Sequence, residues 1–263
     1  MHDRARGPLS AAAWAVLGAG IALQIAYPLT DGGARARLTV AIVLVLASAA
    51  ILAAAVGFGP RWALTSGLVA AGLGFAADVV GTATGYPFGG YEYTGGLGPS
   101  LLGVPLVIAP AWAMGALPAL LAAARLTAGR GRWALGAAAA LGLAAWDVFL
   151  DPQMVADGRW RWDHPAPHLP GVPGVPLTNF AGWALVAALI GAALAALPRP
   201  PGRPSGPGRR VAPGEAQFLW VYASSVLAHA VFLDLPGSAL WGAAAMGLVA
   251  VPLAVRLAAG ARA

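Results

Sequence analysis

Two aspartates, Asp147 and Asp151, stand four residues apart near the end of a mostly apolar stretch that begins at Arg132. On an α-helix this spacing places both carboxyls on one face, about 6 Å apart along the axis. Ionisable groups inside an apolar helix are costly to retain, so we interpret the pair as the centre of a functional site. Paired carboxyls suit general acid–base chemistry. We expect Pro152 to end the helix, because the residue before a proline resists the α region.

The pair also has a structural interpretation. Either carboxyl could be solvated at the end of the helix, or form an ion pair with Arg159 or Arg161 in the next segment of the chain. Asp147, one turn deeper in the helix, is less suited to solvation than Asp151. Two further acids belong to the same region of the predicted fold: Asp78 ends an earlier apolar stretch, and Glu92 lies in the loop after it.

The composition is that of a polytopic membrane protein. The chain of 263 residues is 59% hydrophobic, has a mean hydropathy of +0.73 and is 10% charged, against about a quarter in soluble domains. All 16 basic residues are Arg and lie between apolar segments, a pattern that sets membrane orientation and does not favour nucleic acid. The absence of cysteine excludes a disulfide, a thiolate nucleophile and a Cys-ligated metal.

The apolar segments predict an all-α transmembrane helical bundle. A span needs about 20 mostly apolar residues, and eight stretches qualify. The fourth contains three prolines and should be kinked or broken. The seventh is the weakest, because His229 lies inside it, so seven spans are the alternative. The first follows two Arg, as a signal peptide would, but it is long enough to span and lacks a clear cleavage site. The stretches are Leu9–Tyr27, Leu38–Val56, Trp62–Val80, Leu101–Ala124, Trp133–Leu150, Phe180–Leu197, Ala216–Leu233 and Ala239–Leu257.

A segment rich in Pro, Gly and Arg separates the last two stretches from the first six. Its sequence, PRPPGRPSGPGRRVAP, contains no core-forming run and predicts a flexible linker. We therefore divide the chain into a six-helix catalytic core at 1–197, a cytoplasmic linker at 198–215 and a C-terminal helix pair at 216–263. No internal repeat is apparent.

The distribution of charge predicts an orientation. With eight spans and a cytoplasmic N-terminus, twelve Arg lie inside and four outside. Because cytoplasmic loops are enriched in Arg, this bias favours a multi-pass protein of the cell membrane with both termini cytoplasmic. In the same topology seven acids fall on the outer side or in the outer half of the membrane, which indicates a polar pocket there. They are Asp78, Glu92, Asp147, Asp151, Asp157, Asp163 and Asp234.

The loop at 81–99 combines seven glycines with four aromatic residues around Glu92. Glycine permits close backbone approach, and the aromatics offer flat faces and phenol hydroxyls. An interfacial aromatic belt would explain the composition, but the density favours an ordered re-entrant or capping loop. The glycine spacing matches no phosphate-binding motif. The aromatics are Tyr86, Phe88, Tyr91 and Tyr93.

The segment after the paired aspartates offers little support for a metal site. His164 and His168 are interleaved with prolines, so they do not share a helix face. Asn179 opens the next span, where an N-cap and a substrate contact are equally suitable roles. His229 fits a buried hydrogen-bonding residue better than a catalyst. We expect no metal and no cofactor.

Three segments resemble the carotenoid biosynthesis membrane family, which includes the bisanhydrobacterioruberin hydratases and related carotenoid 1,2-hydratases of archaea and bacteria. They are GTATGYPFGGYEYTGGLGPSLLGVPLVIAPAW, AAWDVFLDPQMVADGRWRW and GVPLTNFAGW, and the resemblance covers about residues 78–183. It implies a cofactor-free lyase that adds water across the terminal C1=C2 bond of an acyclic carotenoid. The implied partners are a lycopene-like or C50 bisanhydro carotenoid, membrane lipid and other membrane enzymes of the same pathway.

The residues suit this chemistry. An acid protonates C2 and leaves a tertiary cation at C1; water attacks the cation and loses a proton to a base. We assign Asp147 as the acid and Asp78 or Asp151 as the base or water-holding group, with Glu92 in support. Aromatic faces can stabilise the cation. The expected substrate-binding residues are Tyr86, Phe88, Tyr91, Tyr93, Trp146, Asn179 and Trp183.

Two other functions use the same features. Cyclisation of a carotenoid end group also begins with protonation, and the acids and aromatics do not distinguish it from hydration. A small proton-coupled transporter or lipid-binding membrane protein would also carry intramembrane acids. The transporter is disfavoured because the acids gather at one face and no inverted repeat is present.

Overall fold

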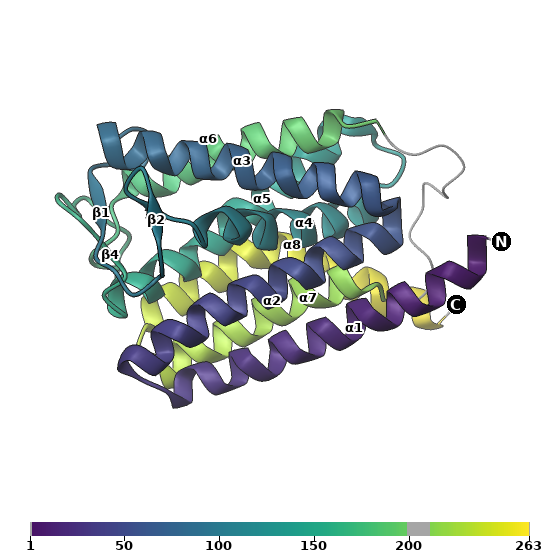
Figure 1. The fold of residues 1–263 in the computed structure, drawn as a ribbon, viewed down its shortest axis with the longest axis horizontal. Helices are drawn as coiled ribbons and strands as arrows, with labels where there is room; N and C mark the ends of the chain where they lie inside the picture. Colours follow the sequence, from purple (N-terminus) through teal and green to yellow (C-terminus); the bar gives the residue numbers. More distant parts are fainter. Residues whose placement is uncertain (1, 199–210, 263) are drawn as a thin grey trace.

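Backbone groups in lipid have no water to bond with, so apolar segments satisfy them internally as helices. The computed structural model describes residues 2–198 and 211–262, and in these ranges the chain forms eight α-helices (Figure 1). The prediction of an all-α bundle is confirmed. The helices are α1 (His2–Ala26), α2 (Gly32–Phe58), α3 (Pro60–Thr84), α4 (Ile108–Leu126), α5 (Gly131–Ala156), α6 (Leu177–Ala196), α7 (Pro213–Leu227) and α8 (Pro236–Arg262).

Short elements complete the fold at the end of the bundle opposite the two termini (Figure 1). Two separate pairs of strands are antiparallel, β1 with β4 and β2 with β3. A 3₁₀ turn, η1, follows α1, and a π-helical turn, η2, extends α7. The elements are β1 (Tyr91–Tyr93), β2 (Ser100–Leu101), β3 (Val104–Pro105), β4 (Trp160–Trp162), η1 (Tyr27–Leu29) and η2 (Ala228–Phe232).

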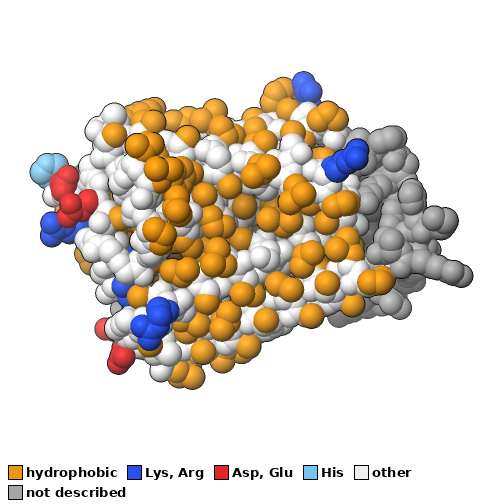
Figure 2. Space-filling model, in the orientation of Figure 1, with side chains coloured by type: hydrophobic (Ala, Val, Ile, Leu, Met, Phe, Trp, Pro, Cys, Tyr) orange, Lys and Arg blue, Asp and Glu red, His pale blue; other side chains and the backbone are white. Residues whose placement is uncertain are grey.

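Among the described residues, seven helices are long and apolar enough to cross a membrane. The exception is α7, which has 15 residues, although η2 continues it for five more. The surface agrees with a location in the membrane: on the face that Figure 2 shows, a broad hydrophobic band separates charged side chains toward the two ends. The chain is therefore an integral membrane protein with a polytopic helical bundle.

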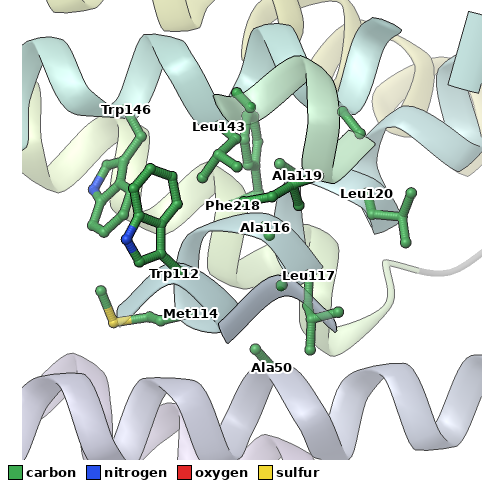
Figure 3. Close-up of a cluster of buried hydrophobic side chains, with 14 of the residues drawn as sticks. Ala50, Trp112, Met114, Ala116, Leu117, Ala119, Leu120, Leu143, Trp146 and Phe218 are labelled. Atoms are coloured by element: carbon green, nitrogen blue, oxygen red, sulfur yellow. The ribbon is translucent and has the colours of Figure 1, made fainter. Parts of the chain in front are cut away.

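The centre of the bundle is α4, which packs against α2, α3, α5, α6, α7 and α8. Small and branched side chains make these contacts, with Leu143 of α5 and Phe218 of α7 closing on Ala116 and Ala119 (Figure 3). At 19 residues α4 is about 28 Å long, whereas α2, α3 and α5 reach about 38 to 40 Å. The central helix is thus shorter than α2, α3 and α5, against which it packs.

The expected start of the fourth span at Leu101 is wrong. Residues 100–105 form the β2–β3 hairpin, and α4 begins at Ile108. Positive φ angles at Leu102 and Gly103 (54° and 83°) turn the chain in this hairpin. Pro110 falls in the first helical turn, where its missing N–H costs nothing. The shortening therefore removes residues from the N-terminal end of the central helix.

The expectation that Pro152 ends its helix is also wrong, because α5 continues to Ala156. A proline inside a helix leaves the carbonyl four residues earlier without its N–H partner, and here that carbonyl belongs to Val148. The Ser238 hydroxyl of α8 donates to the Val148 oxygen at 2.8 Å. His229 Nδ1 lies 2.8 Å from the same hydroxyl oxygen. A side chain from a distant helix therefore replaces the lost backbone bond.

The C-terminal helices pack into the bundle. α7 contacts α1, α2 and α4, and α8 contacts α4 and α5. Most of the predicted linker, residues 199–210, lies outside the described residues, and α7 begins at Pro213. The division of the chain at residues 197 and 215, and the cytoplasmic location of the termini, remain predictions.

A buried ion pair joins α4 to α7. Arg125 Nε and Nη2 donate to the two carboxylate oxygens of Glu215 at 2.6 and 2.8 Å, and both residues are less than 7% exposed. Glu215 also accepts the Ala212 backbone N–H at 2.9 Å, which caps the start of α7. The pair therefore fixes the helix start as well as the contact between helices.

Glu215→Gln should destabilise the protein by about 3–5 kcal/mol, because it leaves a buried guanidinium without its charged partner. Thermal unfolding of the purified protein in detergent measures this. Arg161→Ala breaks an exposed pair with Glu92 and serves as the control, with an expected cost of about 0–1 kcal/mol. Equal effects of the two substitutions would contradict the assignment.

Candidate active site

The short central helix leaves a cavity at the end of the bundle that carries the strands. Its volume is about 160 Å³, below the roughly 300–1,000 Å³ of common small-molecule sites, so it suits one end of a long ligand. The first two turns of α4 form its base, with Ile108 and Trp112 on its wall. Most of the other lining side chains are apolar or aromatic.

Strands β1 and β4, which we call the aromatic lid, cover this cavity. Their register pairs Tyr91 with Trp162 and Tyr93 with Trp160. Because side chains alternate across a strand, these four aromatics line the cavity, and Tyr91 stacks on Trp162 with ring centres 5.5 Å apart. Glu92 and Arg161, paired between them, face outward and form an exposed ion pair of 2.6 Å. The lid therefore has an aromatic inner face and a charged outer face.

Asp78, near the end of α3, is held by three donors. The hydroxyls of Tyr91 and Tyr93 donate to Oδ1 at 2.6 and 2.8 Å, and Trp112 Nε1 donates to Oδ2 at 2.6 Å. Burial and the neighbouring Asp78 carboxyl raise the pKa of both Tyr91 and Tyr93. The phenols therefore stay neutral and remain donors, which ties the lid to the wall of the cavity.

Asp147 and Asp151 share a single amide. Asn179 Nδ2 donates to Oδ2 of Asp147 at 3.0 Å and to Oδ2 of Asp151 at 2.5 Å. Both carboxyls are buried, at 0% and 3% exposure. The alternative role of Asn179 as an N-cap is wrong, because Pro176 caps α6 and the Asn179 side chain faces the carboxyls. Asp147 Oδ1 finds no hydrogen-bond partner among the described residues.

The structure brings most of the predicted site residues together, but not all. Asp147 lies behind Asp151 and Asn179 and does not line the cavity. Glu92 faces solvent on the lid, and Tyr86 is 66% exposed. Neither of these last two lines the cavity. The predicted residues on its wall are Asp78, Asp151, Phe88, Tyr91, Tyr93, Trp146, Asn179 and Trp183.

The ion pairs proposed for the two aspartates do not form. Arg161 pairs with Glu92 instead, and Arg159 Nη2 donates to the backbone oxygen of Gly32 at 3.4 Å. Solvation is excluded by the burial of both carboxyls. The structural interpretation of the aspartate pair is therefore wrong in both of its forms.

Three tryptophans of the site, Trp112, Trp160 and Trp162, were not predicted from the sequence. Trp112 stacks on Trp183 with ring centres 4.1 Å apart, and Trp146 meets Trp183 edge-on at 6.2 Å. Nothing near Trp112 in the sequence links it to Asp78. Trp160 and Trp162 did carry a signal, because WRW and YEY share an alternation of aromatic and charged residues that suits paired strands.

The histidines His164, His168 and His229 lie in two different parts of the fold. Within the described ranges, no group of three or more His, Asp or Glu side chains has the geometry to hold a metal ion. His164 and His168 lie in the exposed segment after β4. His229 is fully buried and bonds Ser238 and Gln153, the hydrogen-bonding role that we favoured for it.

The fold and site define an integral membrane protein with an aromatic and acidic cavity near one end of its bundle. A family profile described as "Carotenoid biosynthesis protein" matches residues 38–256. The chain belongs to this family, which confirms the resemblance seen in its sequence.

Comparison with characterised proteins adds one relative. The chain is 34% identical over 116 residues to a bisanhydrobacterioruberin hydratase of Haloarcula japonica. The alignment covers 42% of this chain and 37% of that hydratase. No solved structure matches the chain.

Gly74→Ala should disturb the site, because an added Cβ would lie 2.0 Å from Cγ of the Trp112 ring. Overpacking of this kind costs about 1–3 kcal/mol and displaces the donor to Asp78. Gly72→Ala, on the same helix with nothing within 4 Å, is the matched control and should be neutral or stabilising. Thermal unfolding in detergent compares the two; an unaffected Gly74→Ala protein would contradict this packing.

Proposed function

We propose that this protein is a carotenoid hydratase that adds water across the terminal C1=C2 bond of an acyclic carotenoid. The observation that carries the proposal is the buried pair Asp147–Asp151, bridged by Asn179, of which Asp151 lines the wall of an aromatic cavity. The family and the hydratase relative support a carotenoid-modifying enzyme. A lycopene-like or C50 bisanhydro carotenoid is the proposed substrate.

The carboxyl pair supplies the proton. Two buried negative charges repel, and sharing one proton between the two carboxyls removes that repulsion. Of the two, Asp151 lines the cavity and Asp147 does not. We therefore modify the assignment made from the sequence: Asp151 protonates C2, and Asp147 shares the proton and holds Asp151 through Asn179. The reaction then needs no cofactor.

Asp78 is the proposed base. Its two oxygens are fixed by Tyr91, Tyr93 and Trp112 on the cavity wall. A water molecule near it would attack the cation at C1 and pass a proton to this carboxylate. C2 gains a proton and C1 a hydroxyl, so the sum is the addition of one water. Return of the proton from Asp78 to the pair resets the site.

The aromatic surroundings favour the cationic intermediate. The stacked rings of Trp112 and Trp183 and the edge-on Trp146 provide faces near the acids, and a cation over such a face gains electrostatic stabilisation. The aromatic lid excludes bulk water, which strengthens these interactions. On the Arg distribution we propose that the lid lies at the outer face of the cell membrane, with both termini cytoplasmic.

Product mass tests the function directly. The chain is expressed in bacteria that make lycopene and, separately, the C50 bisanhydro carotenoid, and the pigments are analysed by chromatography and mass spectrometry. Hydration predicts a gain of one or two waters with an unchanged chromophore. Cyclisation would leave the mass unchanged and shorten the absorption wavelength. No change with either substrate, in membranes that contain the protein, would reject the proposal.

Asp151→Asn should lower turnover by about 10²–10⁴-fold, because it removes the proton donor. Asp147→Asn should also lower it, by disturbing the shared proton, while the cavity still binds pigment. Asp163→Asn, the same chemical change at an exposed acid of the segment after β4, is the control and should retain activity. Product formed per amount of protein is the measurement; near-normal turnover of Asp151→Asn would reject its role.

A further inference from the structure

The aromatic lid closes the end of the cavity that faces water. Three of the four aromatic side chains on its inner face are buried, with Tyr91, Trp160 and Trp162 each 7–8% exposed, and Tyr93 is half-buried. Its outer face carries the exposed ions of Glu92 and Arg161. An apolar chain would have to cross water and displace stacked rings to enter here, so the lid is an unsuitable entrance.

The cavity lining is more exposed where the cavity meets α1 and α7. Most lining residues from the other helices, such as Asp78, Trp112 and Trp183, are buried. The half-buried exceptions are Val43, Ala111, Leu150 and Gln153. The lining residues contributed by α1, η1, α7 and η2 are half-buried, with the exception of Tyr27. These half-buried residues are Gln24, Pro28, Ser224, Ser225, Ala228 and Leu233.

The surface beside these residues belongs to the membrane-facing band. Ile25 on α1 is 55% exposed, and Leu227, Val231 and Phe232 on α7 and η2 are 56%, 64% and 52% exposed. Between them the cavity wall is made of small side chains, two serines and an alanine. A bulky side chain at these positions would fill the space.

Both edges of this region are anchored to the last turns of α5. On one side the Tyr27 hydroxyl donates to the Asp157 carboxylate, which also pairs with Arg35 at 2.9 Å. On the other side His229 Nε2 of η2 lies 3.1 Å from Gln153 Oε1. These bonds hold the two edges to α5 independently of contacts between the edges themselves.

We propose that this region is a lateral portal, formed by Gln24, Pro28, Ser225, Ala228 and Leu233, through which the polyene chain of the substrate lies in the bilayer. The inference rests on the proposed function. A carotenoid is about as long as the hydrocarbon core is thick, so the cavity can take only its end. The remainder needs an opening into lipid. A portal beside the acids lets the end group reach Asp151 while the polyene chain stays in apolar surroundings.

The absence of cysteine makes a direct test available. In lipid nanodiscs, the single thiol of Ser225→Cys is labelled with an apolar maleimide, with and without lycopene or the C50 bisanhydro carotenoid. Carotenoid at about ten times its dissociation constant should slow labelling about tenfold. Val231→Cys, at an exposed position of η2 directly after α7, is the control and should label at an unchanged rate. The arm without carotenoid contains the same lipid, so lipid tails alone cannot produce the difference.

A blocking variant gives a second measurement. Ser225→Trp should abolish pigment retention on the purified protein, while Val231→Trp should retain it. A protein that binds pigment with labelling of the Ser225→Cys thiol unchanged would overturn the portal, as would Ser225→Trp with full pigment and turnover. Protection of the thiol without a gain of water in the product would overturn the hydratase function and leave the portal standing. Failure to bind either carotenoid would overturn both.

Discussion

One amide nitrogen determines the character of the site. Asn179 Nδ2 carries two hydrogens and gives one to each of two buried carboxyls. Without that donor, Asp147 and Asp151 would lose the side chain that bonds both of them, and burying a polar group without such a bond is costly. The Asn179 amide also joins α6 to α5 beside the cavity. The same bond thus stabilises the helix pair and orients the group that faces the substrate.

The cavity itself results from a difference in length. A central helix as long as its neighbours would have filled the space with its own side chains, and the carboxyls would be part of a solid core. Because α4 begins only at Ile108, after the β2–β3 hairpin, its first turns line the cavity. The rest of the cavity wall comes from the neighbouring helices and from the lid. Two loops from different parts of the chain then pair as strands and cover the opening.

Much of this can be derived from the sequence, because apolar length and the i, i+4 spacing of Asp147 and Asp151 are local properties. The approximate positions of the spans, the clustering of acids at one end and the aromatic loop could be predicted, but the start of the fourth span could not. The effect of Pro152 and the roles of Trp112 and Asn179 could not be predicted either, because they depend on contacts between residues far apart in the sequence. The continuation of α5 past Pro152 depends on a hydroxyl that lies 90 residues from the carbonyl it satisfies, and the role of Trp112 depends on the packing of α3 against α4. Asn179 suited an N-cap by type, and only the position of α5 decides otherwise.

The hydrogen bond from Ser238 to Val148 joins α8 to α5, which lie on either side of residues 199–210 in the sequence. The carbonyl that Ser238 satisfies belongs to the turn that carries both aspartates, and His229 bonds the same hydroxyl. A shortened protein ending at residue 197 would keep every carboxyl of the site and lose the group that completes their helix. α7 and α8 therefore support the helical turn that carries the acids, and their removal would leave the Val148 carbonyl without its hydrogen-bond donor.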